Sequence, residues 1–378
     1  MSGPPPEAHA AALAGFSHMT VHRLLALLRR HHPIEAYAVA VGDARPAPGS
    51  LIEKVLANPD VRGAWAASAR RVSPAEVWDR CRALDIEVSV VGTAAHPALL
   101  ADDPLPPPVL FSRGDRVLLD GRRVAVVGTR NATMVGRHLA RRFGDELAHA
   151  GVHIVSGLAR GIDGEAHRGV LARRQPGSGR PIGVVASGLD VVYPREHRTL
   201  WDEVASYGLL VSEWPPGAEP AAHRFPLRNR IIAGLSEIVV VVESRERGGS
   251  LVTADLAAER GVPVMAVPGS AANRAAMGVN ALLRDGSAPV LDAGDVLTAL
   301  QLDHTLQLPF ATERRITPRR DDVASYRACQ QRASTVDGVA TTLGRSPIEV
   351  AMSLARLEQG GWLAQSDGWF EVVGSPLP

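Results

Sequence analysis

The chain has 378 residues and a formal net charge of +1, and 46% of its residues are hydrophobic and 21% charged. This length predicts two or three domains, and the composition excludes an intrinsically disordered chain. The single lysine, Lys54, stands outside any Gly-Lys-Ser/Thr phosphate loop or active-site motif, which excludes a phosphate-loop NTPase and a Schiff-base enzyme.

Several kinds of protein and site are excluded by what the sequence lacks. No apolar run reaches the roughly 18 residues of a membrane span, and the first residues lack the features of a secretory signal. Two cysteines, Cys81 and Cys329, are too few for a disulfide framework or a cysteine-rich zinc site, and the thirteen histidines show no metal-ligand spacing. We therefore expect a cytoplasmic protein with two buried thiols, no membrane segment, no metal and no cofactor.

Residues 1–95 are predicted to form a helical domain. Leu13, Phe16 and Leu24 lie in a run with helical spacing, and Ser73-Pro74 is typical of a helix start. A short strand is expected at 86–91. The proline-rich stretch 97–108 indicates an extended conformation, so we assign 96–121 to a connector that joins the core.

From residue 122 onwards, apolar strands alternate with helix-length segments. The strands are β-branched and apolar on both faces, as in a parallel sheet covered on both sides; they are expected at 123–128, 153–157, 182–188, 209–214, 238–243, 262–269 and 289–292. Helices are expected at 133–150, 160–174, 197–207, 229–236, 250–260 and 293–300. This alternation predicts an α/β fold over 122–300, an extended Rossmann-like doubly wound parallel sheet.

The remaining residues are predicted to form a linker and a small domain. Residues 301–322 show no clear period and are assigned to the linker. Residues 323–378 follow the order helix, turn, helix, hairpin, which is the plan of a winged helix. The segment 324–373 carries four arginines against five acids. A reader of duplex DNA is normally basic, so we predict a protein-contact or accessory role for this domain.

Four loops with small or basic residues follow predicted strands and precede predicted helices. They span 128–131, 156–163, 223–230 and 248–253, and residues 121–183 carry eleven arginines against four acids. Ligands of such sheets bind at the carboxyl ends of the strands. Helix N-termini favour anions there, and arginine forks bind phosphate. The loops therefore predict a surface for phosphate groups.

The glycine spacing disfavours a dinucleotide ligand, because neither Gly128 and Gly136 nor Gly157 and Gly161 fit the dinucleotide fingerprint. Phe225 lies in a basic loop, and stacking of an unpaired base on such a ring is worth about 1–3 kcal/mol. Burial of the same ring in the core beneath the loop is an equally open interpretation.

Catalytic patterns are weak. Asp163, Asp190, Glu213 and Glu243 fall near predicted strand ends, but carboxylates there more often cap helices or pair with arginines. No nucleophile with a neighbouring base is evident. We therefore expect that the protein is not an enzyme.

Taken together, the loops resemble those of the bacterial DNA-processing protein family DprA, also called Smf. The matching stretches cover nearly all of 97–300 in the family's order, and include VAVVGTRNATMVG (124–136), IVSGLARGIDGEAHRG (154–169), FPLRNRIIAGLS (225–236) and GGSLVTADLAAERGVPVMAVPG (248–269). The resemblance implies a non-enzymatic protein of natural transformation. It would bind incoming single-stranded DNA without sequence preference, protect it and load the RecA recombinase. It also implies a homodimer, a sterile-alpha-motif-like N-terminal domain and a winged helix.

The resemblance further implies which residues contact DNA. These are Arg130, Ser156, Gly157, Arg224, Phe225, Asn229, Arg230, Gly249 and Ser250. Arg160 and Arg228 lie in the same basic loops and complete the predicted set.

The alternative is a Rossmann-like nucleotide-binding enzyme, such as a nucleoside-monophosphate phosphoribohydrolase. Those enzymes use a PGGxGT-type loop followed by a catalytic glutamate. Here Gly248-Gly249-Ser250 precede Asp255 and Glu259, but the proline and the Gly-Thr pair are missing. Release of free base from nucleoside monophosphates would distinguish the two functions.

Overall fold

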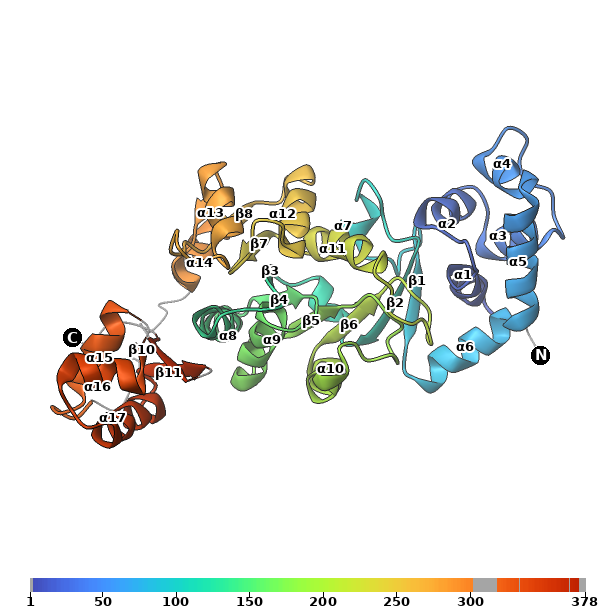
Figure 1. The fold of residues 1–378 in the computed structure, drawn as a ribbon. Coiled ribbons are helices and arrows are strands. Elements are labelled where there is room, and N and C mark those ends of the chain that lie inside the picture. The colour runs from blue at the N-terminus through green and yellow to red at the C-terminus, as the bar shows by residue number, and fades with distance from the viewer. Residues whose placement is uncertain (1–2, 302–317, 333, 367, 374–378) are drawn as a thin grey trace.

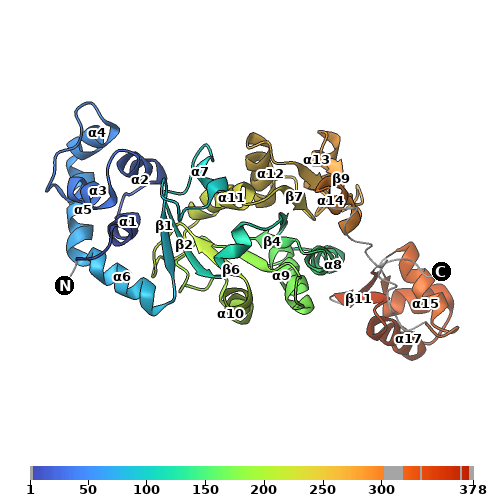
Figure 2. The same cartoon turned by 180° about the vertical axis from the view of Figure 1, so that it is seen from behind.

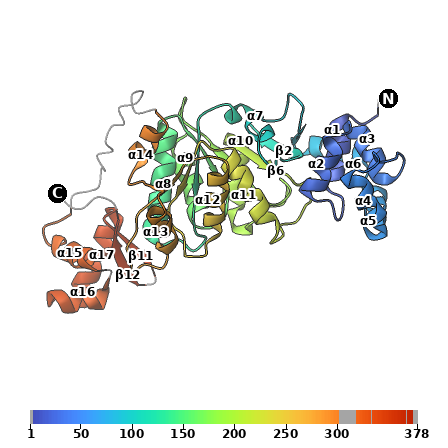
Figure 3. The ribbon, with the colours of Figure 1, turned by 90° about the horizontal axis from the view of Figure 1, so that it is seen from above.

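The computed structural model describes residues 3–301, 318–332, 334–366 and 368–373. The chain forms an N-terminal helical part, a central α/β part and a small C-terminal part. They follow one another in space in chain order (Figure 1). The views from behind and from above agree that the helical part and the C-terminal part lie at opposite ends of the sheet (Figure 2, Figure 3). No helix within the described ranges is long and apolar enough to span a membrane.

Six helices follow one another over residues 6–83. They are α1 (Pro6–Ala14), α2 (Val21–Leu28), α3 (Pro33–Val41), α4 (Leu51–Ala57), α5 (Pro59–Arg71) and α6 (Pro74–Ala83). Four of them begin with proline, which has no N–H to leave unpaired in a first turn. Helix α6 begins where the Ser-Pro pair predicted a helix start, and Ser73 and Glu76 form a reciprocal capping box there.

The helical part shares one apolar core with the edge of the sheet. Leu13 and Trp65 belong to the same buried cluster as Phe111 and Trp201 of the central part. An ion pair of 2.7 Å between Arg80 and Asp190 also joins the two parts.

The central part contains a nine-stranded sheet within the described residues, in the order β1-β2-β6-β5-β4-β3-β7-β8-β9. Strands β3 to β9 run parallel and alternate with helices, whereas β2 runs antiparallel to both of its neighbours, β1 and β6. The bounds are β1 (Glu87–Val90), β2 (Val109–Gly114), β3 (Arg123–Val127), β4 (His153–Ser156), β5 (Pro181–Val184), β6 (Leu209–Ser212), β7 (Ile238–Val241), β8 (Val264–Ala266) and β9 (Ala288–Pro289).

Helices cover both faces of the sheet, so the predicted doubly wound α/β fold is confirmed. One face carries α8 (Met134–His149), α9 (Ile162–Arg173) and α10 (Arg198–Tyr207), and the other carries α7 (Ala98–Ala101), α11 (Arg224–Gly234), α12 (Gly249–Glu259) and α13 (Met277–Arg284), as Figure 1 shows. Helix α14 (Ala293–Ala299) packs against α8. Short 3-10 helices lie at η1 (Arg116–Leu119) and η2 (Arg195–His197).

Three parts of the sequence-based description of the elements were wrong. The stretch 96–121 contains α7, β2 and η1, and β2 pairs with β6, so the sheet begins at residue 87 and not at 122. Helix α11 begins at Arg224 and not at 229, because Pro226 is tolerated in a first helical turn. Helix α13 was not predicted.

The C-terminal part has its own small core around Tyr326, Leu354 and Trp362. Its elements are α15 (Val323–Gln331), β10 (Ser334–Thr335), α16 (Val336–Leu343), α17 (Pro347–Gln359), β11 (Leu363–Ser366) and β12 (Trp369–Val372), an order typical of a winged helix. Residues 302–317 of the predicted linker, and 374–378, lie outside the described residues. Both cysteines are buried, as predicted.

The buried ion pair between Asp103 and Arg260 ties the segment after α7 to the end of α12. The Nε–Oδ2 and Nη2–Oδ1 distances are 2.6 and 3.0 Å, and both side chains are less than a tenth exposed. We expect Asp103→Ala to lower the free energy of unfolding by about 3–5 kcal/mol, because it leaves a buried guanidinium unpaired. The measurement is chemical denaturation.

The matched control removes both charges. The double variant Asp103→Leu/Arg260→Met is expected to recover most of the lost stability, since it leaves no unpaired charge. Equal losses in the single and double variants would contradict this account of the pair.

Candidate nucleic-acid interface

Two hollows lie side by side at the carboxyl ends of the central strands. The larger, about 850 Å³, is called here the Tyr193 hollow, and the smaller, about 350 Å³, the Gly249 hollow. Both are lined by the loops after β3 and β4 and by the first turns of α11. They share Arg130, Asn131, Ala159, Phe225 and Arg228. The two hollows therefore form one groove, and the shared residues lie where they meet.

Phe225, Arg130 and Tyr193 form a cluster at this meeting point. The guanidinium carbon of Arg130 lies 4.8 Å from the centre of the Phe225 ring. The Tyr193 and Phe225 ring centres are 5.5 Å apart, with the rings tilted by 52°. Tyr193 is 41% exposed and Phe225 half-buried. Of the two interpretations of Phe225, the structure places the ring at the groove wall rather than in the core.

The loop after β4 shapes the floor of the groove. Gly161 has a φ of +73°, which favours glycine, and buried Leu158 has a φ of +54°, which a leucine rarely adopts. A Cβ on Gly157 would clash with the guanidinium of Arg228, so a larger residue there would force this buried side chain to move. Nδ1 of His197 lies 3.0 Å from the Leu158 carbonyl oxygen and holds the loop from below.

Arg228 fixes this loop from inside the protein. Its side chain is buried, and Nη1 donates hydrogen bonds to the carbonyl oxygens of Gly157 and Val184, the former at 2.7 Å. Burial lowers the pKa of Arg228 to about 10, and the nearby Asp163 opposes that shift. Burial also raises the pKa of Asp163, and the attraction to Arg228 opposes it. The two buried charges therefore stabilise each other beneath the groove.

The Gly249 hollow lies at the N-terminus of helix α12. This helix has no side-chain cap at Gly248, and residues 248–250 line the hollow near the positive end of the helix dipole, which favours anions. The amide of Asn229 donates to the Gly249 carbonyl oxygen at 3.3 Å and links α11 to this loop. The exposed side chains of Arg245 and Arg247 also line the hollow.

Eight of the eleven predicted site residues line the groove, and three do not. The eight are Arg130, Gly157, Arg160, Phe225, Arg228, Asn229, Gly249 and Ser250. Ser156 is fully buried, and its hydroxyl donates to the Val126 carbonyl oxygen at 2.6 Å. Arg230 is buried, donates to the Leu105 carbonyl oxygen at 2.7 Å and pairs with Glu213.

Arg224 points away from the groove. Its guanidinium lies 5.4 Å from the Trp214 ring centre and donates to the Glu219 carbonyl oxygen at 2.7 Å. Two groove residues also have internal partners: exposed Arg160 pairs with Glu196, and the buried Ser250 hydroxyl donates to Ser244 at 2.9 Å.

The four carboxylates weighed as catalytic candidates all have partners. Asp163 accepts from the Gly157 N–H at 3.1 Å, and Asp190 accepts from Arg80 and from the Gly217 N–H, both at 2.7 Å. Glu213 pairs with Arg230, and Glu243 accepts from the N–H and hydroxyl of Thr133 at 2.9 and 2.5 Å.

Asp255 and Glu259, which the enzyme alternative needs, are exposed on α12 and line neither hollow. Among the described residues, no three His, Cys, Asp or Glu side chains gather where they could hold a metal ion.

The sequence analysis missed several groove residues. Tyr193, Arg195 and Arg198 line the Tyr193 hollow, and Arg245 and Arg247 line the Gly249 hollow. A signal for the first three was present, because the segment YPREHR places an aromatic ring and three basic side chains after a predicted strand. The same reasoning that singled out Phe225 applies to Tyr193.

Comparison with known proteins gives one consistent family. A family model described as DNA recombination-mediator protein A matches residues 87–301. The DNA processing protein DprA of Bacillus subtilis is 44% identical over 196 residues, which are 52% of this chain and 65% of that protein. Protein Smf of Escherichia coli is 39% identical over 281 residues, 72% of this chain and 74% of that protein. The chain thus spans just under two thirds of the B. subtilis relative's length.

Two solved structures are similar over most of their own lengths. The X-ray structure of DprA from Streptococcus pneumoniae has a TM-score of 0.65 and 30% identity, and covers 79% of this chain and 98% of that one. A Helicobacter pylori structure has a TM-score of 0.51 and 29% identity, and covers 57% of this chain and 97% of that one. That structure is described as giving insight into the single-stranded DNA binding mode of DNA processing protein A.

The buried position of Arg228 leads to a prediction about stability. We expect Arg228→Ala to lower the free energy of unfolding by about 3–5 kcal/mol, because the buried carbonyl oxygens of Gly157 and Val184 lose their donor and the buried Asp163 loses the nearby opposite charge. The matched variant Arg160→Ala removes an exposed ion pair and is expected to cost at most about 1 kcal/mol. Urea denaturation of both variants measures the difference, and equal small losses would show that Arg228 does not support the loop.

Proposed function

The chain belongs to the DNA recombination-mediator protein A family, and we propose that it binds single-stranded DNA along the groove without sequence preference. The cluster of Arg130, Phe225 and Tyr193 is the observation that carries this proposal, because it places two aromatic rings and a cation where the two hollows meet. An unpaired base stacks on a ring of this kind, and a guanidinium holds the neighbouring phosphate.

The surroundings of the cluster favour a phosphate backbone that continues in both directions. On one side lie the α12 N-terminus, Arg245 and Arg247, and on the other lie Arg195 and Arg198. Arginine forks and helix N-termini bind phosphates, and phosphate contacts carry no sequence information directly. Affinity would come from charge and stacking, which every sequence offers.

Membership of the family supports a proposal for the wider role. We propose that the protein is a non-enzymatic mediator of natural transformation that acts in the cytoplasm as a homodimer, protects incoming single strands and loads RecA onto them. The partnered state of Asp163, Asp190, Glu213 and Glu243 supports a binding role, since each carboxylate is engaged within the protein. The binding mode named for the H. pylori relative supports the choice of ligand.

The groove proposal makes a prediction about affinity. Phe225→Ala is expected to weaken binding of single strands by roughly 5- to 150-fold, because it removes about 1–3 kcal/mol of stacking, and to affect duplex binding less. Arg130→Ala is expected to weaken binding equally for all sequences and to reduce the salt dependence, because one phosphate contact is lost. Fluorescence anisotropy over a salt series measures both effects.

The control for these two variants is Arg62→Ala, which removes the same charge from an exposed site on α5. It should leave affinity unchanged. Unchanged binding by both Arg130→Ala and Phe225→Ala would place the DNA elsewhere on the protein.

The C-terminal part is proposed to contact proteins. The exposed face of α17, the helix that would enter a DNA groove in a winged helix, carries Ile348 at 74% and Met352 at 58% exposure. Exposed apolar side chains of this kind suit a protein partner better than a phosphate backbone.

Removing the C-terminal part tests this role. A chain that ends at residue 301 is expected to bind single-stranded and duplex DNA as tightly as the full chain, because α17 adds no phosphate contact. Gel shifts with both DNA forms measure this. A loss of duplex binding beyond about tenfold would show instead that the winged helix reads duplex DNA.

A further inference from the structure

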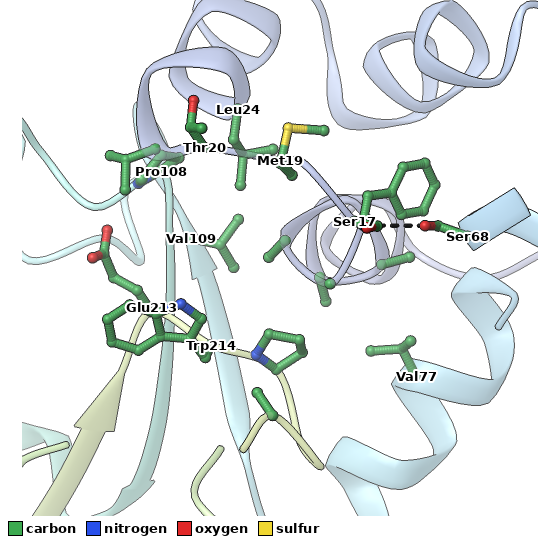
Figure 4. A pocket seen from close by; sticks show the side chains of 18 of the residues that line it. Ser17, Met19, Thr20, Leu24, Ser68, Val77, Pro108, Val109, Glu213 and Trp214 are labelled. Carbon is green, nitrogen blue, oxygen red and sulfur yellow. Dashed lines mark hydrogen bonds between the residues drawn. The ribbon is translucent and has the colours of Figure 1, made fainter. Parts of the chain in front are cut away.

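A third cavity lies where the N-terminal helices meet the sheet. Its volume is about 880 Å³, and it is lined by residues 14–22 around the α1–α2 turn, by 213–218 after β6 and by the first turn of α11 (Figure 4). Gly15 packs against Pro215 beside it, and the Ser17 N–H donates to the Ser68 hydroxyl at 3.0 Å. The two parts share one core at this seam, so the walls of the cavity are fixed relative to each other.

The cavity is apolar inside and has basic side chains at its rim. Met19, Leu24, Val109 and Trp214 surround its interior, as Figure 4 shows. Basic or titratable side chains lie around the opening, namely His18, His22, Arg71, His223 and Arg224. Among the described residues that line the cavity, Glu213 is the only acid, and its carboxylate is held by Arg230. A flat, apolar-faced ligand that carries negative charge fits this arrangement.

Arg224 connects the cavity to the DNA groove. It lines the cavity, whereas the next residue, Phe225, lines both hollows. The segment before them also lies between the two: residues 215–218 line the cavity, and Glu219 and Pro220 line the Tyr193 hollow. The linings of the cavity and of the Tyr193 hollow therefore adjoin at residues 218 and 219 and again at residues 224 and 225.

The Trp214 side chain offers the stacking surface that the cavity needs. Its ring is half-buried, and the guanidinium carbon of Arg224 lies 5.4 Å from the ring centre. This is a cation–π contact. Nε of Arg224 is buried and has no hydrogen-bond partner in the protein. The same two kinds of group, a ring and a guanidinium, meet at Phe225 and Arg130 in the groove.

We propose that this cavity is a second base-binding site for the same DNA strand. A base would stack on Trp214 within the apolar interior, and its phosphate would lie among Arg71, Arg224 and the rim histidines. The proposal rests on the proposed function, because it extends the strand beyond Phe225 onto the N-terminal helices. The length of DNA bound then depends on both parts of the protein.

An oligonucleotide length series tests the proposal with two neighbouring arginines on α5. Arg71 lines the cavity, whereas the equally exposed Arg70 does not, so Arg70→Ala is a matched control for Arg71→Ala. With strands of about 12 nucleotides, Arg71→Ala and Trp214→Ala are expected to weaken binding at least about fivefold. With strands of about four nucleotides, which fill the groove alone, both should match the wild type. Arg70→Ala should match the wild type at both lengths.

Crosslinking provides a readout that a misfolded variant cannot imitate. Strands with 5-iodouracil at successive positions are irradiated on the wild-type protein, and the modified peptides are identified. The proposal requires crosslinks within residues 14–24 or 213–224 from one end of the longer strand. It is overturned if none form there and Arg71→Ala equals Arg70→Ala at both lengths.

The outcomes also separate this proposal from the one on which it rests. If Arg130→Ala weakens binding while the cavity variants do not, the groove binds DNA and the cavity does not. If the wild-type protein binds no single strand of either length, both proposals fail. If the cavity variants weaken the binding of an acidic peptide and leave DNA binding unchanged, the cavity is assigned to the peptide and its role for bases is overturned.

Discussion

The arrangement of the groove depends on one buried arginine. Arg228 joins α11 to the loop after β4 and to the end of β5 through the carbonyl oxygens of Gly157 and Val184. A buried guanidinium is tolerated only when its charge and donors are satisfied, and Asp163 and these carbonyl groups satisfy them. Because the loop carries Ala159 and Arg160 into the groove, the position of Arg228 decides where the groove floor lies.

The first two turns of α11 distribute their side chains over three environments. Successive residues on a helix point about 100° apart. Phe225 and Asn229 therefore share the face toward the groove, Arg224 faces the cavity beside the N-terminal helices, and Arg230 turns inward to Glu213. One short basic segment thus supplies a stacking ring, a cation for a neighbouring cavity and two internal braces.

Much of the fold and part of the site follow from the sequence. The parallel strands were predictable because most of them lie in short apolar runs rich in β-branched residues, and the loops after parallel strands lie at one edge of the sheet. The burial of Arg228 and Arg230 was not predictable. It depends on the rotation of α11 about its axis, and this helix was expected to begin five residues later. Strand β2 was hidden by the prolines that precede it, and its place beside β6 is a long-range pairing that no local pattern records. Tyr193 reaches Phe225 only through the folded chain.

The central claim is that the groove holds an unpaired strand by stacking and charge. Fluorescence anisotropy of the wild-type protein with single-stranded and duplex oligonucleotides of equal length, over a salt titration and without nucleotide or metal, tests it most directly. The account predicts clearly tighter binding of the single strand, with an affinity that falls steeply as salt increases. Equal binding of both forms, or no binding, would contradict it and would make the groove a site for a small nucleotide.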